Sequence, residues 1–551
     1  MPARSSDNKP DPEDRYRNFS IQVPEFFNFG YDVVDIWAEK EPDKTALLWV
    51  NQQGEEKRYS FWDMKMGSDA AARLLQESGI GPGARVFVML PRIPEWWILV
   101  VALIKRGAVY TPATTLLTSH DISYRLKAGG FALVITDREN APKVQEAARE
   151  QSSKPKCMVV DGDLPGWISY PEEMASGTRT GVHIPAVKTR SSDSLLIFFT
   201  SGTTGNPKMV LHDHSYALGH IVTARLWQDV KPSDLHFTIT DTGWAKSAWG
   251  NLFGQWIEGT AVFVYDIRGK FDPAEIPPLL MRYGITTFCC PPTIYRMLIL
   301  LDLKRYNFSR LRHCLSAGEP LNPEVIRIWK EKTGLPIYEG YGQTETVLCI
   351  GAFPGRECPP GSMGKPAPGW HVELHDRHGR PVGVNREGRI AISLNPRPVG
   401  LFQEYIGNDA ANRKSFVKGW YYTDDKAALD EDGYFWFIGR DDDVIKASGY
   451  RIGPFEVESA LLEHPSVAEA AVVGSPDPIR GTIVKAFVVL KPGFVPSDRL
   501  MVDLQEHVKQ VTAPYKYPRA IEFVDSLPKT HSGKIRRNEL REREVKKGET
   551  G

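Results

Sequence analysis

A continuous apolar stretch that ends in a loop of glycines, hydroxyls and a lysine constrains this chain more than any other segment. The stretch, residues 195–199, contains only Leu, Ile and Phe and predicts a buried β-strand. The loop that follows contains Thr200, Ser201, Gly202, Thr203, Thr204, Gly205, Asn206, Pro207 and Lys208. Glycines let backbone N–H groups approach an anion closely, and the hydroxyl and ammonium groups supply further donors. The loop indicates a phosphate-binding site, although an ordinary Ser-, Thr- and Gly-rich turn has a similar composition.

Length and charge limit the classes of protein to which the chain can belong. With 551 residues, it is too long to fold around a single hydrophobic core. Its residues are 42% hydrophobic and 25% charged, as in ordinary globular proteins, and 68 basic residues balance 68 acidic ones. This balance gives no indication of a nucleic-acid partner or of an anionic membrane surface.

The cysteines and the N-terminal segment both bear on the cellular compartment. The six cysteines show neither a C-x-x-C spacing nor a metal-ligand pattern with histidine, which favours a reducing compartment. Residues 1–18 are polar and acidic, without an apolar signal segment. The longest apolar run, residues 96–104, is too short to span a bilayer. We therefore expect a cytoplasmic protein without membrane insertion; its oligomeric state is left open.

Apolar segments of strand length alternate with amphipathic segments up to residue 351. Residues 86–90, for example, precede a helical segment at 94–106, and another strand is expected at 133–136. This alternation predicts parallel or mixed sheets that are covered by helices. Beyond residue 351, short strands separated by glycine-containing turns predict a β-rich region.

A charged segment, residues 439–443, separates two well-patterned regions and predicts a domain boundary. Beyond it, a helix is expected at 454–462 and a strand at 470–473, a pattern typical of a compact α+β domain. The predicted fold is α/β. A large N-terminal domain, residues 1–439, contains two α/β-layered subdomains and a β-rich subdomain, and a small α+β C-terminal domain covers residues 440–551.

Three further motifs carry side chains that suit nucleotide chemistry. Thr344 and Glu345 set a hydroxyl beside a carboxylate, a pair that can hold a phosphate together with Mg²⁺. Asp425 follows a predicted strand, where its carboxylate can accept hydrogen bonds from ribose hydroxyls. Lys534 lies in a glycine-hinged loop, residues 528–535, near the end of the chain.

These motifs occur in a fixed order along most of the chain. They read T-S-G-T-T-G-x-P-K, Y-G-Q-T-E, Y-T-x-D, G-R-x-D-D and P-K-T-x-S-G-K. The chain thereby resembles the AMP-forming acyl-CoA synthetases of the adenylate-forming superfamily, which also includes luciferases and peptide-synthetase adenylation domains. The variants at 207–209, 243–244, 448–456 and 476–481 are most similar to those of medium-chain acyl-CoA synthetases.

The resemblance implies an acid–thiol ligase with two half-reactions. A carboxylate attacks the α-phosphate of ATP to give an acyl-adenylate and pyrophosphate, and the thiol of CoA then displaces AMP. Two alternatives share part of this chemistry: an enzyme that loads a carrier protein, and a non-catalytic nucleotide sensor. The direction of the reaction also stays open, because a thioester and an ATP phosphoanhydride are similar in energy.

The resemblance also implies roles for individual residues of the large domain. The 200–208 loop would hold the β- and γ-phosphates, Thr344 the α-phosphate, and Glu345 the Mg²⁺ ion. Asp425 and Arg440 would hold the ribose. The remaining residues expected around the nucleotide are Gly318, Glu319, Pro320, Glu339, Gly340, Tyr341, Gly342 and Gln343.

In the small domain, Lys534 would bridge the carboxylate and the α-phosphate, and it is a plausible target of regulatory acylation. Family behaviour implies that this domain is mobile and rotates about a hinge at Asp442 after adenylation. After the rotation, Ser448, Gly449 and Tyr450 would line a CoA tunnel, and Arg451 would stay near the phosphate. Arg480 and Lys509 could contact the phosphates of CoA.

The residues of the acyl pocket determine which carboxylic acid the enzyme would accept. Acetyl-specific relatives carry Trp at the position of Gly342, so the glycine is expected to leave room for a longer, branched or cyclic acyl group. The candidate pocket residues are Trp227, Trp244, Lys246, Trp249, Cys289 and Gly342. Core tryptophans and a surface lysine are the alternative interpretation. We predict a short-to-medium, branched, alicyclic or aromatic monocarboxylate, with acetate or propionate as the alternative.

One residue departs from the family pattern. The family usually has Thr-Gly-Asp where this chain has Thr423, Asp424 and Asp425. Asp tolerates a positive φ angle better than most residues, so weakened nucleotide binding is the largest effect expected.

Overall fold

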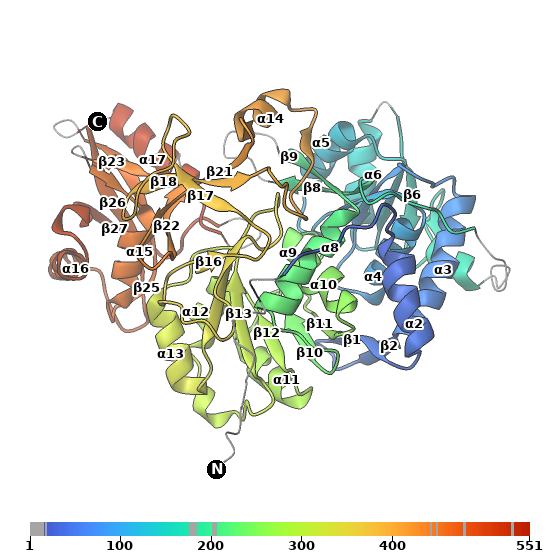
Figure 1. The fold of residues 1–551 in the computed structure, drawn as a ribbon. Helices are drawn as coiled ribbons and strands as arrows, with labels where there is room; N and C mark the ends of the chain where they lie inside the picture. The colour runs from blue at the N-terminus through green and yellow to red at the C-terminus, as the bar shows by residue number, and fades with distance from the viewer. Residues whose placement is uncertain are drawn as a thin grey trace, which may run out of the picture.

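The computed structural model describes residue 16 and residues 19–151, 153–175, 185–200, 207–440, 443–447, 450–477, 481–529 and 534–550. Within these ranges, the side chains of residues 446, 450, 451 and 548–550 are not described. A large N-terminal domain contains sheets of eight, nine and five strands, and a smaller C-terminal domain contains sheets of two and three strands. The small domain packs against one end of the large one (Figure 1).

The eight-stranded sheet carries the predicted phosphate loop. In spatial order its strands are β19 (Glu404–Ile406), β9 (Lys208–Asp213), β8 (Ser194–Thr200), β4 (Val109–Pro112), β3 (Arg85–Met89), β5 (Leu133–Thr136), β6 (Lys156–Val159) and β7 (Ile168–Ser169). β3 to β6 are parallel, whereas β8 and β9 form an antiparallel pair. The loop therefore joins β8 to β9 at one end of this pair.

The nine-stranded sheet forms the second α/β layer. Its spatial order is β16 (Lys365–Pro366), β15 (Ile350–Gly351), β14 (Ile337–Tyr341), β13 (His313–Ala317), β12 (Thr287–Cys289), β10 (Leu235–Thr238), β11 (Ala261–Asp266), β1 (Thr45–Asn51) and β2 (Glu56–Ser60). The strands from β14 to β1 run parallel. The turns after β13 and β14, at the carboxyl ends of these strands, are where open α/β sheets bind ligands.

Helices cover both sheets, as the alternating sequence pattern predicts. The N-terminal half contains α2 (Ile36–Lys40), α3 (Phe61–Glu77), α4 (Pro94–Lys105), α5 (Ser119–Gly129), α6 (Ala141–Arg149) and α7 (Tyr170–Ala175). Further along the large domain lie α8 (Ser215–Ile221), α9 (Ala245–Gly250), α10 (Phe253–Ile257), α11 (Ile276–Arg282), α12 (Pro292–Leu298), α13 (Pro323–Thr333) and α14 (Asp409–Ser415). α4 is apolar on every face, and its burial explains this.

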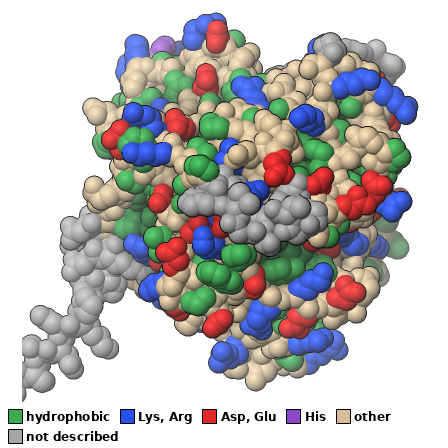
Figure 2. All heavy atoms as spheres, turned by 90° about the vertical axis from the view of Figure 1, so that its right-hand side faces the viewer, with side chains coloured by type: hydrophobic (Ala, Val, Ile, Leu, Met, Phe, Trp, Pro, Cys, Tyr) green, Lys and Arg blue, Asp and Glu red, His purple; other side chains and the backbone are tan. Residues whose placement is uncertain are grey.

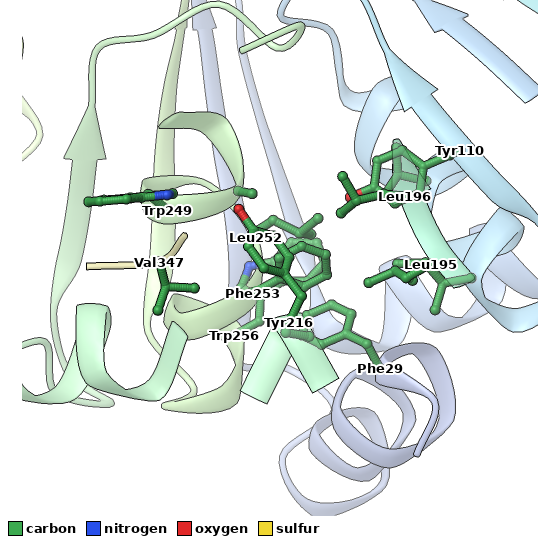
Figure 3. Close-up of a cluster of buried hydrophobic side chains, with 14 of the residues drawn as sticks. Phe29, Tyr110, Leu195, Leu196, Tyr216, Trp249, Leu252, Phe253, Trp256 and Val347 are labelled. Atoms are coloured by element: carbon green, nitrogen blue, oxygen red, sulfur yellow. The ribbon is translucent and has the colours of Figure 1, made fainter. Parts of the chain in front are cut away.

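The largest hydrophobic core joins the two sheets. Leu195 and Leu196 of β8 face a group of aromatic side chains that includes Tyr216, Phe253 and Trp256, from α8 and α10 (Figure 3). Ring contacts among Phe29, Phe61, Phe253 and Trp256 continue this core toward the N-terminus. A single packed interior thus fixes the two α/β layers relative to each other.

The β-rich region and the small domain complete the fold. The five-stranded sheet consists of β17 (Val372–His375), β18 (Glu387–Ser393), β21 (Trp420–Leu429), β20 (Phe416–Val417) and β22 (Phe435–Arg440). The small domain contains β23 (Ile445–Ala447), β24 (Tyr450–Ile452), α15 (Pro454–Glu463), β25 (Val467–Asp477), β26 (Gly481–Leu490), α16 (Asp498–Val511), β27 (Ala520–Phe523) and α17 (Arg537–Thr550). β22 ends at Arg440, so this sheet extends one residue past the predicted end of the large domain at residue 439. The division into two domains at this position stays a prediction.

The surface agrees with the balanced composition. On the face shown in Figure 2, basic and acidic side chains of the described residues are interspersed. Within the part of the chain that the structure describes, no helix combines the length and the hydrophobicity needed to cross a bilayer.

Candidate active site

A cavity of about 1570 Å³ lies where the two α/β layers, the β-rich sheet and the small domain meet. The predicted site residues that line it are Thr200, Pro207, Lys208, Trp244, Gly318, Glu319, Pro320, Glu339, Gly340, Tyr341, Gly342, Gln343, Thr344, Glu345, Asp425, Arg440 and Lys534. These residues come from segments that are far apart in the sequence. The predicted residues 201–206, 442, 448, 449 and 480 lie outside the described residues, as do the side chains of 450 and 451.

The turn after β14 holds Thr344 and Glu345 by their main chain. The Nε2 atom of His212 lies 2.8 Å from the carbonyl oxygen of Thr344, and the amide of Phe402 donates to the carbonyl oxygen of Glu345 at 2.8 Å. Burial lowers the pKa of His212 to about 3, so its ring is neutral at neutral pH. A carbonyl oxygen can only accept, which places the single ring proton on Nε2. Sequence reasoning missed both His212 and Phe402.

The carboxylate of Glu345 fits a Mg²⁺ ligand. It is almost fully buried yet lines the cavity, and the hydroxyl of Tyr405 donates to its Oε1 at 2.8 Å. The ammonium of Lys208 lies 4.2 Å from the centre of the Tyr405 ring. The end of the phosphate loop and the candidate Mg²⁺ ligand therefore both contact one aromatic residue. Tyr405 was not predicted from the sequence.

The predicted ribose-binding carboxylate is held by two neighbours. The hydroxyl of Tyr341 and the amide of Gln343 each donate to Oδ2 of Asp425 at 2.6 Å. In the β21–β22 pair, Asp425 is opposite Arg440. Burial raises the pKa of Asp425, and the charge of Arg440 opposes that shift. Among the described residues no hydrogen bond reaches Oδ1, which leaves that oxygen to accept from a ribose hydroxyl.

Asp424, which stands where the family usually has glycine, adopts the left-handed backbone conformation that glycine favours. Its φ angle is +61°, and its carboxylate pairs with the ammonium of Lys414 on α14 at 2.9 Å. The added negative charge is therefore partnered at the rim of the cavity, which both residues line. The ion pair offsets the charge that was expected to weaken nucleotide binding.

Glu339, one of the residues predicted around the adenine, lines the cavity as a buried acid. Its Oε1 accepts a hydrogen bond from the amide of Leu321 at 3.1 Å. Burial raises its pKa from about 4.5 to about 8, so the carboxyl group is protonated at neutral pH.

Replacing Glu339 by Gln is expected to stabilise the enzyme selectively at alkaline pH. Between the unfolded and folded pKa values the native state holds a proton that the unfolded state has lost, so native stability falls as pH rises through this range. A glutamine at this position would keep the acceptor for Leu321 and carry no charge. The melting temperature of Glu339→Gln should exceed that of the wild type by about 2–4 °C near pH 9 and match it near pH 5. An equal difference at both pH values would contradict the buried-acid interpretation.

Lys534 reaches the cavity from the small domain. Its positive charge opposes the rise in the pKa of Asp425 and adds to the fall in the pKa of Lys246, so Lys534 lies near both residues. The small domain docks on the large one through Asn322, whose side-chain amide donates to the carbonyl of Ser459 at 3.2 Å. This arrangement suits the first half-reaction, in which a cation is needed at the α-phosphate.

The acyl side of the cavity differs from the expectation for Gly342. A Cβ atom on Gly342 would lie 2.4 Å from Cη2 of Trp249 and 2.6 Å from the carbonyl oxygen of Val347. The space above the glycine is therefore already filled by the Trp249 indole, and the expectation that Gly342 leaves it open is wrong. The sequence could not show this, because the contact joins residues from separate segments.

The other predicted acyl-pocket residues divide into lining and core. Trp244 lines the cavity, whereas Trp227 is fully buried and donates from Nε1 to the carbonyl of Glu339 at 3.2 Å. Cys289 is buried at the end of β12. Lys246 is not a surface lysine: its ammonium donates to the carbonyl of Ala317, and burial lowers its pKa. Trp227 thus matches the core interpretation rather than the pocket interpretation.

Little of the predicted CoA site falls on described residues. Lys509 lies on α16, where it pairs with Glu506 at 2.6 Å and lies over the ring of Tyr517. It does not line the cavity in this arrangement of the domains. Its contact with CoA stays a prediction.

The family of the chain follows from comparison with known proteins. Residues 34–405 match the AMP-binding enzyme family, and residues 456–534 match the AMP-binding enzyme C-terminal domain. Acyl-coenzyme A synthetase ACSM3, mitochondrial, from Homo sapiens is 48% identical over 547 residues, which cover 97% of this chain and 92% of the relative. That relative is mitochondrial, as are its counterparts in other mammals, and this contradicts the cytoplasmic location expected from the sequence.

Solved structures give the same result for the fold and the reaction. The anthranilate CoA ligase AuaEII in complex with anthranoyl-AMP has a TM-score of 0.86 at 30% identity, covering 95% of this chain and 98% of its own. A benzoate CoA ligase from Burkholderia xenovorans LB400 has a TM-score of 0.81 at 27% identity, covering 94% and 100%. The chain therefore belongs to the AMP-binding enzyme family and is an AMP-forming acyl-CoA synthetase, an acid–thiol ligase that uses ATP, Mg²⁺ and CoA.

Proposed function

We propose that the enzyme activates short-to-medium monocarboxylates whose acyl group is branched, alicyclic or aromatic. The observation that carries this proposal is that the indole of Trp249 occupies the position where a Cβ on Gly342 would lie. The indole, which lies behind Gly342 and is not among the cavity-lining residues, would limit the depth of the acyl space, while Trp244 lines the cavity and would supply an apolar wall. A flat ring or a short branched chain suits a wide and shallow slot of this kind, whereas a long extended chain does not.

The likeness to aromatic-acid ligases supports the same substrate class. AuaEII was solved with anthranoyl-AMP, and the ligase from Burkholderia xenovorans LB400 acts on benzoate. Both acids are planar and short. We infer that this chain shares the preference for compact acyl groups.

The residues of the cavity would divide the first half-reaction among them. Lys534 would stabilise the negative charge that develops as the carboxylate attacks the α-phosphate and pyrophosphate leaves. Thr344 would bind the α-phosphate, and Asp425 with Arg440 would hold the ribose. Bound to Glu345, Mg²⁺ would neutralise phosphate charge. In the second half-reaction the small domain would rotate about Asp442 and bring the predicted CoA-contacting residues to the cavity.

A panel of acids tests the substrate class. CoA-dependent AMP release would be measured with acetate, butyrate, 2-methylpropanoate, cyclohexanecarboxylate, benzoate and dodecanoate. We expect kcat/KM for the branched and cyclic acids to exceed that for acetate and dodecanoate by about tenfold or more, since one methylene in a fitted pocket is worth at least this factor. Efficient turnover of acetate alone would contradict the proposal.

A further inference from the structure

The two phosphate-binding parts of the site belong to different sheets. The loop for the β- and γ-phosphates ends at Lys208, the first residue of β9 in the eight-stranded sheet. Thr344, expected at the α-phosphate, follows β14 of the nine-stranded sheet. In-line attack requires these parts to keep one relative position, because a small misplacement of reacting groups slows the reaction strongly.

His212 connects these two parts. It lies further along β9 than Lys208 and on the same face, because side chains alternate along a strand. From there its Nε2–H donates at 2.8 Å to the main-chain carbonyl of Thr344, 132 residues away in the sequence. This hydrogen bond therefore connects β9, the strand that follows the phosphate loop, directly to Thr344, the residue expected at the α-phosphate.

The surroundings of His212 hold its ring in place. The ring packs on Tyr216 with centroids 3.9 Å apart, and Tyr216 contacts His220 at 4.6 Å. His220 in turn contacts Phe253 and Trp249, two members of the core cluster in Figure 3. His212 is almost completely buried and is not among the residues that line the cavity. It acts on the site through Thr344 and not by touching the substrate.

We propose that His212 is a positioning residue for adenylation, which holds the carbonyl of Thr344 so that this residue faces the α-phosphate. The proposal rests on the function proposed above for Thr344. The amide of Phe402 donates in the same way to the carbonyl of Glu345. Both main-chain carbonyl groups of the Thr344–Glu345 pair are therefore held by hydrogen bonds from residues that do not belong to the turn. The side chains of Thr344 and Glu345 are then left to face the cavity, which both residues line.

Two substitutions at His212 separate the hydrogen bond from the packing. His212→Phe keeps an aromatic ring against Tyr216 but has no donor, whereas His212→Gln keeps an N–H donor and loses the ring. His220→Phe is the matched control, because neither ring nitrogen of His220 has a hydrogen-bond partner among the described residues. All three variants should be checked for an unchanged melting temperature.

The expected result is a selective loss in His212→Phe. Its kcat for acid-dependent ATP–pyrophosphate exchange should fall about tenfold or more, because the carbonyl of Thr344 loses its partner, while KM for the acid stays unchanged. His212→Gln should recover most of kcat, and His220→Phe should behave as wild type. Equal losses in His212→Phe and His212→Gln, or wild-type kcat in His212→Phe, would overturn the proposal.

A binding measurement keeps this test independent of the acid substrate. ATP affinity, measured by calorimetry without acid, should weaken in His212→Phe and recover in His212→Gln. If the wild type activates none of the acids in the panel, the proposed substrate class fails, but the comparison of ATP affinities still decides the role of His212. Unchanged ATP affinity in His212→Phe would then contradict the proposal.

Discussion

Replacing Lys534 by Ala is expected to abolish most of the first half-reaction and to spare the second. Lys534 lines the cavity and is near enough to Asp425 and Lys246 for its charge to act on both. Loss of a preorganised cation at the reacting phosphate should lower ATP–pyrophosphate exchange by about 10²–10³-fold. Formation of the thioester from supplied acyl-adenylate and CoA should continue, since that step does not need charge stabilisation at an attacked α-phosphate.

A neighbouring lysine provides the control for this experiment. Lys529 lies in the same loop region but pairs with Glu469 at 2.7 Å, and it is not among the cavity-lining residues. Lys529→Ala should therefore keep wild-type exchange and thioester formation. If Lys534→Ala exchanges pyrophosphate as fast as Lys529→Ala, Lys534 has no role in adenylation. If both half-reactions fall together, the substitution has damaged the fold or the docking of the small domain.

The sequence predicted those parts of the site that are contiguous in the chain. The apolar run at 195–199 forms the centre of β8. Thr200 and Lys208, the first and last residues of the predicted phosphate loop, line the cavity. Thr344 and Glu345 lie in one turn, where local pattern and side-chain chemistry were sufficient. Segments predicted from their apolar pattern and length, such as the helix at 94–106, agree with α4. Local rules work here because burial on one face leaves a periodic apolar pattern in the sequence, and burial on all faces leaves a continuous apolar run.

Contacts between distant segments could not be predicted in this way. Trp249 fills the space above Gly342 only because α9 packs beside the turn after β14. The bond from His212 to Thr344 likewise depends on how two sheets pack, and a single histidine within a strand carries no periodic signal. The raised pKa of Glu339 arises from burial that the motif itself does not reveal. The motifs therefore identify the reaction, whereas packing determines the shape and electrostatics of the pocket.

Replacing Trp249 by Ala is expected to lengthen the acyl chain that the enzyme prefers. The substitution removes the indole that lies 2.4 Å from the position of a Cβ on Gly342, and so opens the depth of the slot. Each additional methylene that gains a fitted apolar contact raises kcat/KM by about tenfold or more, so the optimum should move from compact acids toward hexanoate and octanoate. Ratios of kcat/KM between acids, measured within each variant, cancel any general loss of activity.

The reciprocal substitution supplies the control for this prediction. Gly342→Ala keeps Trp249 and adds a methyl group that would overlap its indole and the carbonyl of Val347, so these groups must shift and we expect the slot to narrow. Activity with benzoate should fall in Gly342→Ala relative to acetate, the opposite direction to Trp249→Ala. Because these two residues touch, the effects in the double variant should not be additive. An unchanged preference for chain length in Trp249→Ala would show that another part of the cavity determines the acyl substrate.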